Sequence, residues 1–168
     1  DERIDINKAN KQHQTPINVA CHQGQIEMVK LLLNDKRIDL NQVENEHGST
    51  PLHYACQNDH FIIVQYILGI GRNVNLNIKD INEKTAIDIT KEKMKIAKYW
   101  EREEEFQERK RKCVKNIELL ESFERNPIET RTKLRIQLGF AGNNFIIFLF
   151  LSFFLFFFLF FFAFILIN

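Results

Sequence analysis

The chain has 168 residues, a formal net charge of +1 at pH 7, and 27% charged residues. This length accommodates one ordinary domain or a few small modules. The balanced charge excludes the bulk attraction to nucleic acid that a strongly basic chain would have. The three Cys residues are too few and too scattered for a disulfide framework or a zinc site.

Internal repetition is the clearest pattern in the first half of the chain. QTPINVACHQGQIEMVKLLL at residues 14–33 aligns with STPLHYACQNDHFIIVQYIL at residues 49–68. Thr15, Thr50 and Thr85 follow one another at intervals of 35 residues. RIDIN at 3–7 also recurs as RIDLN at 37–41 and, more loosely, as NVNLN at 73–77. A fixed period of this length indicates a repeat architecture.

Each repeat is expected to form a helix, a turn, a second helix and an extended stretch. Pro16 and Pro51 suit a first helical turn, and each follows a Thr that can cap the helix. Apolar residues then recur at helical spacing in both predicted helices. Gly24 marks the turn in the first repeat, and Asp59, which tolerates the left-handed conformation, takes its place in the second.

These segments resemble the ankyrin repeat. The signature Thr-Pro-Leu-His-x-Ala is intact at residues 50–55, with weaker copies TPINVA at 15–20 and TAIDIT at 85–90. The resemblance implies an all-α ankyrin-repeat helical solenoid over residues 1–90. The expected units are a partial repeat at 1–9, repeats at 10–43 and 44–78, and a degenerate repeat at 79–100 that runs into the next segment. The opening within a repeat leads us to expect further repeats before Asp1.

The degenerate repeat is expected to have a shortened loop between its helices. Ile96, Tyr99 and Trp100 stand where the apolar residues of a second helix belong. A solenoid unit cannot bury its own faces, and about three repeats are needed for stability.

A long charged helix is predicted at 91–125. In this stretch 20 of 35 residues are charged, and it has no Gly or Pro. Apolar residues at 3-4 spacing are interrupted by Glu103 and Lys110. Two interpretations stay open: a short coiled coil with a partner, or a long amphipathic helix that caps the open end of the repeats. The interrupted seam favours the cap.

A short basic helix is predicted at 126–139. Asn126 can cap it, Pro127 suits its first position, and Glu129 completes a pattern like a capping box. Gly139 is a natural helix stop.

A transmembrane-like hydrophobic helix is predicted at 145–167. The only polar residue there is Ser152, and 12 of the 16 Phe residues of the chain lie in this run. A helix of this length spans about 34 Å, enough for a hydrocarbon core of about 30 Å. Arg131, Lys133 and Arg135 precede it, so the repeats are expected to face the cytosol from a single-pass membrane anchor.

A second interpretation of the tail concerns the coding sequence. Phe, Leu, Ile, Ser and Asn have T-rich or A-rich codons, so translated noncoding DNA gives a similar run. The tail is then absent from the protein, and the repeats are expected in the cytoplasm.

No phosphate loop, metal-ligand spacing or hydrolase signature is present, so no enzyme, cofactor, metal or small-molecule substrate is expected. Cys21 and Cys56 share one repeat position and are interpreted as packed residues rather than nucleophiles.

The resemblance implies that partners bind at the hairpin tips and the inner-helix face. Carried over residue by residue, these positions are Lys11, Gln12, Gln14, His22 and Gln23, then Glu46, His47, Ser49, Gln57 and Asn58, and finally Ile81, Asn82 and Lys84. The same residues serve equally well as a merely solvated surface.

The sequence predicts a non-enzymatic adaptor that binds another protein through its ankyrin repeats and a lipid bilayer through 145–167. One alternative is a soluble ankyrin fragment of a larger multidomain protein. A further one is a helical scaffold that acts through 91–125.

Overall fold

The computed structural model describes residues 4–44, 46–70, 72–100 and 102–140, with the backbone alone for residues 98–100. Within these ranges the chain forms helices joined by loops and no strand, which confirms the all-helical prediction for this part. Residues 1–134 form one compact unit, and residues 135–140 are the described part of a second.

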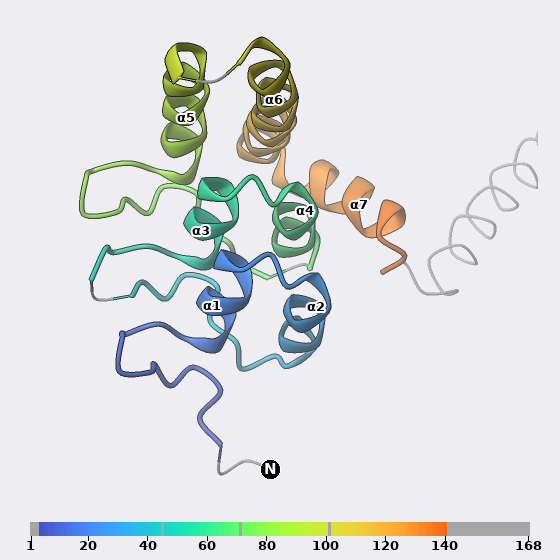
Figure 1. Cartoon of the computed structure of the whole chain (residues 1–168). Helices are drawn as coiled ribbons and strands as arrows, with labels where there is room; N and C mark the ends of the chain where they lie inside the picture. Colours follow the sequence, from blue (N-terminus) through green and yellow to red (C-terminus); the bar gives the residue numbers. More distant parts are fainter. Residues whose placement is uncertain (1–3, 45, 71, 101, 141–168) are drawn as a thin grey trace, which may run out of the picture. The chain divides into compact units, whose positions relative to one another are not determined.

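Two similar helix pairs open the first unit (Figure 1): α1 (Pro16–His22) with α2 (Ile26–Asn34), and α3 (Pro51–Gln57) with α4 (Phe61–Gly69). Thr15 and Thr50 cap α1 and α3, and a Pro occupies the first turn of each helix. Each Thr hydroxyl accepts a backbone N–H from the first turn, which otherwise has no partner inside the helix. The predicted starts of both inner helices are therefore confirmed.

The turn between the paired helices needs a left-handed residue. Gly24 has φ of 71° and Asp59 has φ of 58°, and both conformations agree with the sequence prediction. At Gly24 an added Cβ would also lie 2.5 Å from the imidazole of His60, so that ring would have to move. The positive φ is thus the main reason for glycine in the first turn.

The helices form two layers. In Figure 1 the inner helices α1, α3 and α5 (Ala86–Trp100) stack in one column, and α2, α4 and α6 (Glu103–Arg125) stack beside them. Ile17, Leu33, Ile63 and Leu68 are each at most 1% exposed between the layers. Their burial is the main stabilising contribution of the stack, at about 1.5–3 kcal/mol for each large apolar side chain.

The loops between repeats are tied by side chains that recur with the repeat. The Asn7 amide donates to the carbonyl oxygen of Arg37 (2.7 Å) and accepts the N–H of Asp39 (3.0 Å). Asn41 makes the same two bonds, at 2.9 and 2.8 Å, with the loop that follows α4. Arg72 donates to the carbonyl oxygens of Leu33 and Asp35, both at 2.7 Å, and so caps the end of α2.

The third repeat differs from the sequence prediction. Its inner helix does not end early: α5 runs for 15 residues to Trp100, and the second helix is α6, which begins at Glu103. The single charged helix expected at 91–125 is therefore two antiparallel helices. Lys91 near the start of α5 pairs with Glu121 near the end of α6 at 2.9 Å. Arg102 is extended, and three Glu residues in the first turn of α6 complement the helix dipole.

The cap interpretation of the charged segment agrees with the packing. One face of α6 is buried, with Cys113, Asn116 and Leu120 at 0% and Phe123 at 3% exposure. This face contacts α4 and α5. Ile96, one of the apolar residues at 3-4 spacing in the charged segment, is by contrast 51% exposed on α5. The buried face of α6 is thus used within the chain, against the repeats.

The predicted basic helix is observed as α7 (Pro127–Gln137). The Asn126 side chain accepts the N–H of Glu129 (3.2 Å) and donates to its carboxylate (2.9 Å), which is the expected capping arrangement. Gly139 has φ of 74°, in agreement with a helix stop. Earlier in the helix, Arg131 donates to the carbonyl oxygen of Arg72 (2.9 Å) and its guanidinium lies 5.4 Å from the ring of Phe123.

The hydrophobic helix expected at 145–167 lies outside the described residues. Among the helices that the structure does describe, α1 to α7, none combines the length and apolar character that a membrane span requires.

Candidate functional site

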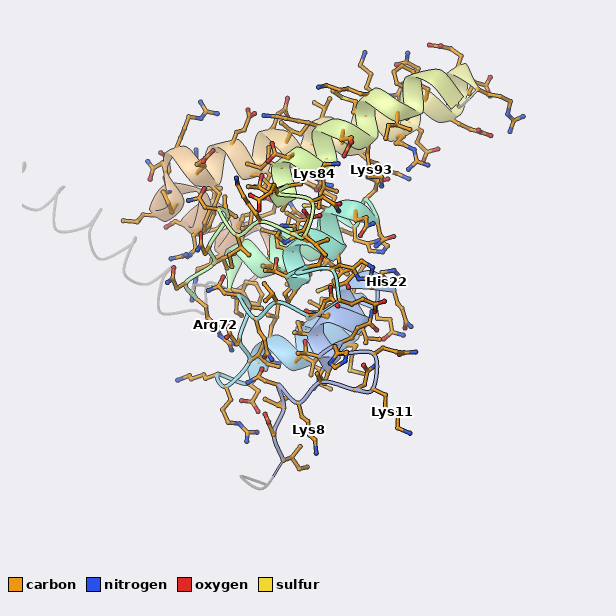
Figure 2. All side chains as sticks on the ribbon, turned by 90° about the vertical axis from the view of Figure 1, so that its left-hand side faces the viewer. Lys8, Lys11, His22, Arg72, Lys84 and Lys93 are labelled. Carbon is orange, nitrogen blue, oxygen red and sulfur yellow. The ribbon has the colours of Figure 1, made fainter. Side chains whose placement is uncertain are left out.

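A groove runs along the face where the inner helices meet the loop tips. It encloses about 370 Å³ and is bounded by α3 and α5, by His22 at the end of α1, and by the loops that precede the inner helices. Figure 2 views this side of the repeats directly, with His22, Lys84 and Lys93 labelled.

The structure brings together seven of the thirteen residues that the sequence singled out. Those that line the groove are Gln14, His22, His47, Ser49, Gln57, Asn82 and Lys84. The remaining six do not line it: Lys11, Gln12, Gln23, Glu46, Asn58 and Ile81. Of these, Asn58 donates its side-chain amide to the carbonyl oxygen of Tyr54 (3.0 Å), so it serves the end of α3. Ile81 lies at a loop tip and is 68% exposed.

Six further residues of the groove were not predicted: Tyr54, Asp80, Ile89, Glu92, Lys93 and Ile96. The repeat period could have found two of them. Glu92 follows Gln57 by 35 positions and Gln57 follows His22 by 35, so all three occupy one repeat position. Lys93 follows Asn58 in the same way. Because the third repeat was expected to be degenerate, the binding positions were not carried over beyond Lys84.

The charged side chains of the groove are engaged with other groups of the chain. Lys84 pairs with Glu92. Lys93 pairs with Asp59 at 2.8 Å, and the Asp59 carboxylate is only 11% exposed. One carboxylate oxygen of Asp80 accepts the backbone N–H groups of Asn82 (2.8 Å) and Lys84 (2.9 Å). The groove thus presents its neutral hydrogen-bonding groups more freely than its charges.

His53, in the second position after the Pro of the signature, fixes the loop side of the groove. It is 2% exposed, and its Nδ1 accepts the N–H of Thr50 (3.2 Å) while its Nε2 donates to the carbonyl oxygen of Lys84 (3.2 Å). Burial lowers the pKa of His53 below its ordinary value, so the neutral imidazole is favoured. His53 therefore holds the loop that carries Lys84 but does not itself line the groove.

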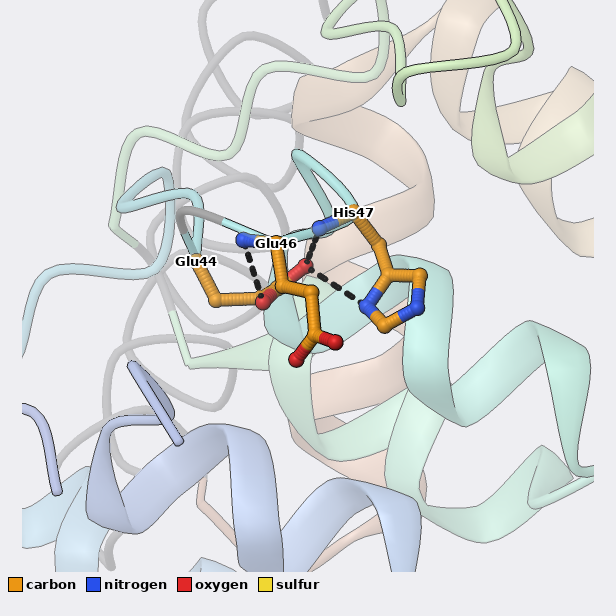
Figure 3. Close-up of side chains that lie close together, drawn as sticks. All are labelled: Glu44, Glu46 and His47. Atoms are coloured by element: carbon orange, nitrogen blue, oxygen red, sulfur yellow. Dashed lines mark hydrogen bonds and ion pairs between the residues drawn. The ribbon is translucent and has the colours of Figure 1, made fainter. Parts of the chain in front are cut away.

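A second cluster combines Glu44, Glu46 and His47 at the tip of the middle loop (Figure 3). Their ligand atoms lie within 4.8 Å of one another. The buried Glu44 carboxylate already accepts the N–H groups of Glu46 (2.9 Å), His47 and Ser49 (3.4 Å), and it pairs with the imidazole of His47 (3.3 Å). Its oxygens thus organise the loop, as Asp80 does in the next one.

The cysteines do not have the environment of nucleophiles. Cys21, Cys56 and Cys113 are unpaired and at 0% exposure. Burial raises the pKa of Cys56 to about 12 and that of Cys113 to about 11, and it raises the pKa of Cys21 well above its ordinary value. Because the thiolate is the reactive form, these neutral thiols act as packing residues.

Comparison with known proteins identifies the repeats. Residues 2–80 match the family model described as ankyrin repeats in three copies. Alpha-latroinsectotoxin-Lt1a of Latrodectus tredecimguttatus is 36% identical over 80 residues, which are 48% of this chain and 6% of that protein. Ankyrin repeat and SAM domain-containing protein 6 of Rattus norvegicus is 36% identical over 84 residues, which are 50% of this chain and 9% of that protein. The match thus spans less than a tenth of each relative.

Proposed function

Because residues 2–80 are a segment of ankyrin repeats, we propose that this chain is a non-enzymatic adaptor that binds another protein through its groove. Ankyrin repeats in general mediate binding to other proteins and are not catalytic modules. A fold alone warrants no more than this class of function, so the specific surface has to be argued from the residues.

The observation that carries the proposal is the convergence of separate segments on one groove. Residues from three successive loops and from α1, α3 and α5 line it, and seven of them are positions that the ankyrin resemblance implies for partner binding. Gln57 and His47 are exposed, and neither is needed for the buried core. A surface of polar groups held on rigid helices and tied loops suits the recognition of a polypeptide partner.

The test compares the double variant His47→Ala/Gln57→Ala with Glu118→Ala, an exposed change on α6 outside the groove. The full chain and both variants are expressed in cells, and co-purifying proteins are quantified by mass spectrometry. We expect the groove variant to lose about tenfold or more of a specific partner, since central interface residues carry most of the affinity. Equal capture by all three proteins would rule out the groove as the binding surface.

The place of the repeats in a larger protein is a separate proposal. Each relative named above is far longer than its matching segment, and this favours the alternative in which the repeats belong to a larger multidomain protein. A single-pass anchor at 145–167, with the repeats on the cytosolic side, rests on the composition of that run alone. If the run is not translated, the cytoplasm is the proposed location.

A further inference from the structure

The third inner helix is longer than its two equivalents. α1 and α3 have seven residues each, whereas α5 has 15. Gly24 and Asp59 occupy one repeat position and turn the chain with positive φ. The next residue at that period is Met94, a good helix former that avoids positive φ. The helix therefore continues past the point at which the other two turn.

The added length gives the groove a wall that the first two repeats lack. Lys93 and Ile96 belong to the added length, and together with Ile89 in the earlier part of α5 they lie on one face of the helix, at spacings of four and three. All three line the groove. Figure 2 shows α5 continuing beyond Lys93, past the end of α3. Ile96 is 51% exposed at this extended end, so the polar groove ends on an apolar side chain.

The charged side chains of the groove already have partners within the chain, so they attract a charged ligand less than unpaired charges would. Lys84 forms a salt bridge with Glu92, and Lys93 forms one with Asp59. The carboxylate of Asp80 accepts backbone N–H groups of its own loop. A partner charge would have to compete with these pairs, whereas an apolar side chain on Ile96 would displace only water. The groove therefore offers a partner an apolar contact at Ile96 and neutral hydrogen-bonding groups along the rest of its length.

We propose that the partner is a polypeptide segment without a dominant charge, which places one apolar side chain on Ile96 and hydrogen-bonds to the neutral groups of the groove. This inference rests on the proposed function and adds the chemistry of the partner to it. Gln14, Gln57 and Asn82 offer amide donors and acceptors for a backbone, because each amide carries both. Because Ile96 lies on the extended part of α5, it is the groove residue that selects the apolar side chain of the partner.

The experiment pans a random peptide library displayed on phage against the full chain held in lipid nanodiscs. Affinities of enriched peptides are then measured for the chain, for Ile96→Asp and for Ile62→Asp. Ile62 is the matched control, since it is 46% exposed on α4 and does not line the groove. The His47→Ala/Gln57→Ala variant reports on the groove itself, and thermal melts confirm that every variant is folded.

We expect enriched peptides to share one aliphatic or aromatic position. Ile96→Asp should weaken them about tenfold or more, and Ile62→Asp should change the affinity by about twofold or less. Raising NaCl from about 0.05 M to about 0.5 M should have little effect, because no unpaired charge is screened. If the peptides bind Ile96→Asp fully but do not bind the His47→Ala/Gln57→Ala variant, the inference is overturned. The proposed function then still stands. A failure to enrich any peptide that depends on the groove overturns the inference, and the co-purification test described above decides the proposed function separately.

Discussion

The Nε2 atom of His53 lies 3.2 Å from the carbonyl oxygen of Lys84, and this contact joins the second inner helix to the loop before the third. The other ring nitrogen accepts hydrogen bonds from the backbone N–H and the hydroxyl of Thr50, at 3.2 and 2.7 Å. One neutral imidazole therefore accepts hydrogen bonds at the start of α3 and donates one to the neighbouring loop. Lys84, whose carbonyl oxygen makes this contact, also lines the groove.

The pH dependence of stability should show the neutral state of His53. Burial lowers its pKa from the ordinary value of 6.5, so the unfolded chain binds more protons between the two pKa values and stability rises with pH. The contribution is complete above pH 6.5 and is lost as the pH falls through the folded pKa. Denaturant melts of the chain and of His53→Gln from about pH 7 to about pH 5 should give a flatter profile for the variant. Parallel profiles would contradict this assignment.

Asn18 offers a stabilising substitution. It occupies the repeat position of His53, is 0% exposed, and its side-chain nitrogen and oxygen have no hydrogen-bond partner among the described residues. Asn18→His should reproduce the tie to the next loop, at the carbonyl oxygen of Ser49, and raise the free energy of unfolding by about 1 kcal/mol. Chemical denaturation measures the change, with Asn18→Ala as the comparison. A histidine variant no more stable than the alanine variant would show that the tie does not form.

Asp59 should hold the helical cap on the repeats. Its carboxylate accepts hydrogen bonds from Lys93 of α5 (2.8 Å) and Arg109 of α6 (3.0 Å). Asp59→Asn keeps a residue that tolerates positive φ but removes a negative charge that Lys93 and Arg109 share, so we expect the free energy of unfolding to fall by about 2 kcal/mol. Thermal unfolding followed by circular dichroism gives the size of the loss. Glu118→Gln, an exposed change on α6, is the control and should have almost no effect.

The tail can be tested without a structure. If 145–167 anchors the chain, the full chain should stay in the membrane pellet after alkaline carbonate extraction, and a chain ending at residue 140 should not. Recovery of both proteins in the supernatant would exclude an anchor. Sequencing the transcript across codons 140–150 would show independently whether the run is encoded in the mature message.

The first two repeats could be predicted closely because their signals are local. Thr15 and Thr50 as caps, the prolines after them, and Gly24 with Asp59 at the turns each act within a few residues. The same holds for α7, whose capping Asn126 is followed directly by a proline.

The third repeat could not be predicted in the same way, because its break depends on packing. No Gly or Pro separates α5 from α6, and the chain reverses there so that Leu120 and Phe123 can be buried. A local signal was nevertheless present: the acidic residues Glu103, Glu104 and Glu105 suit the first turn of a new helix. Missing this start also hid Glu92 and Lys93 as groove residues, since the inner-helix positions of the first two repeats were not carried over to the third beyond Lys84.

Site-specific photo-crosslinking tests the central claim most directly. A benzophenone side chain is placed at Gln57 within the groove, or at Glu118 on the exposed face of α6, in the full chain expressed in cells. Our account predicts a crosslink to a discrete protein from position 57, absent from position 118 and abolished by His47→Ala. A crosslink of equal strength from both positions, or from position 118 alone, would contradict the groove as the binding surface.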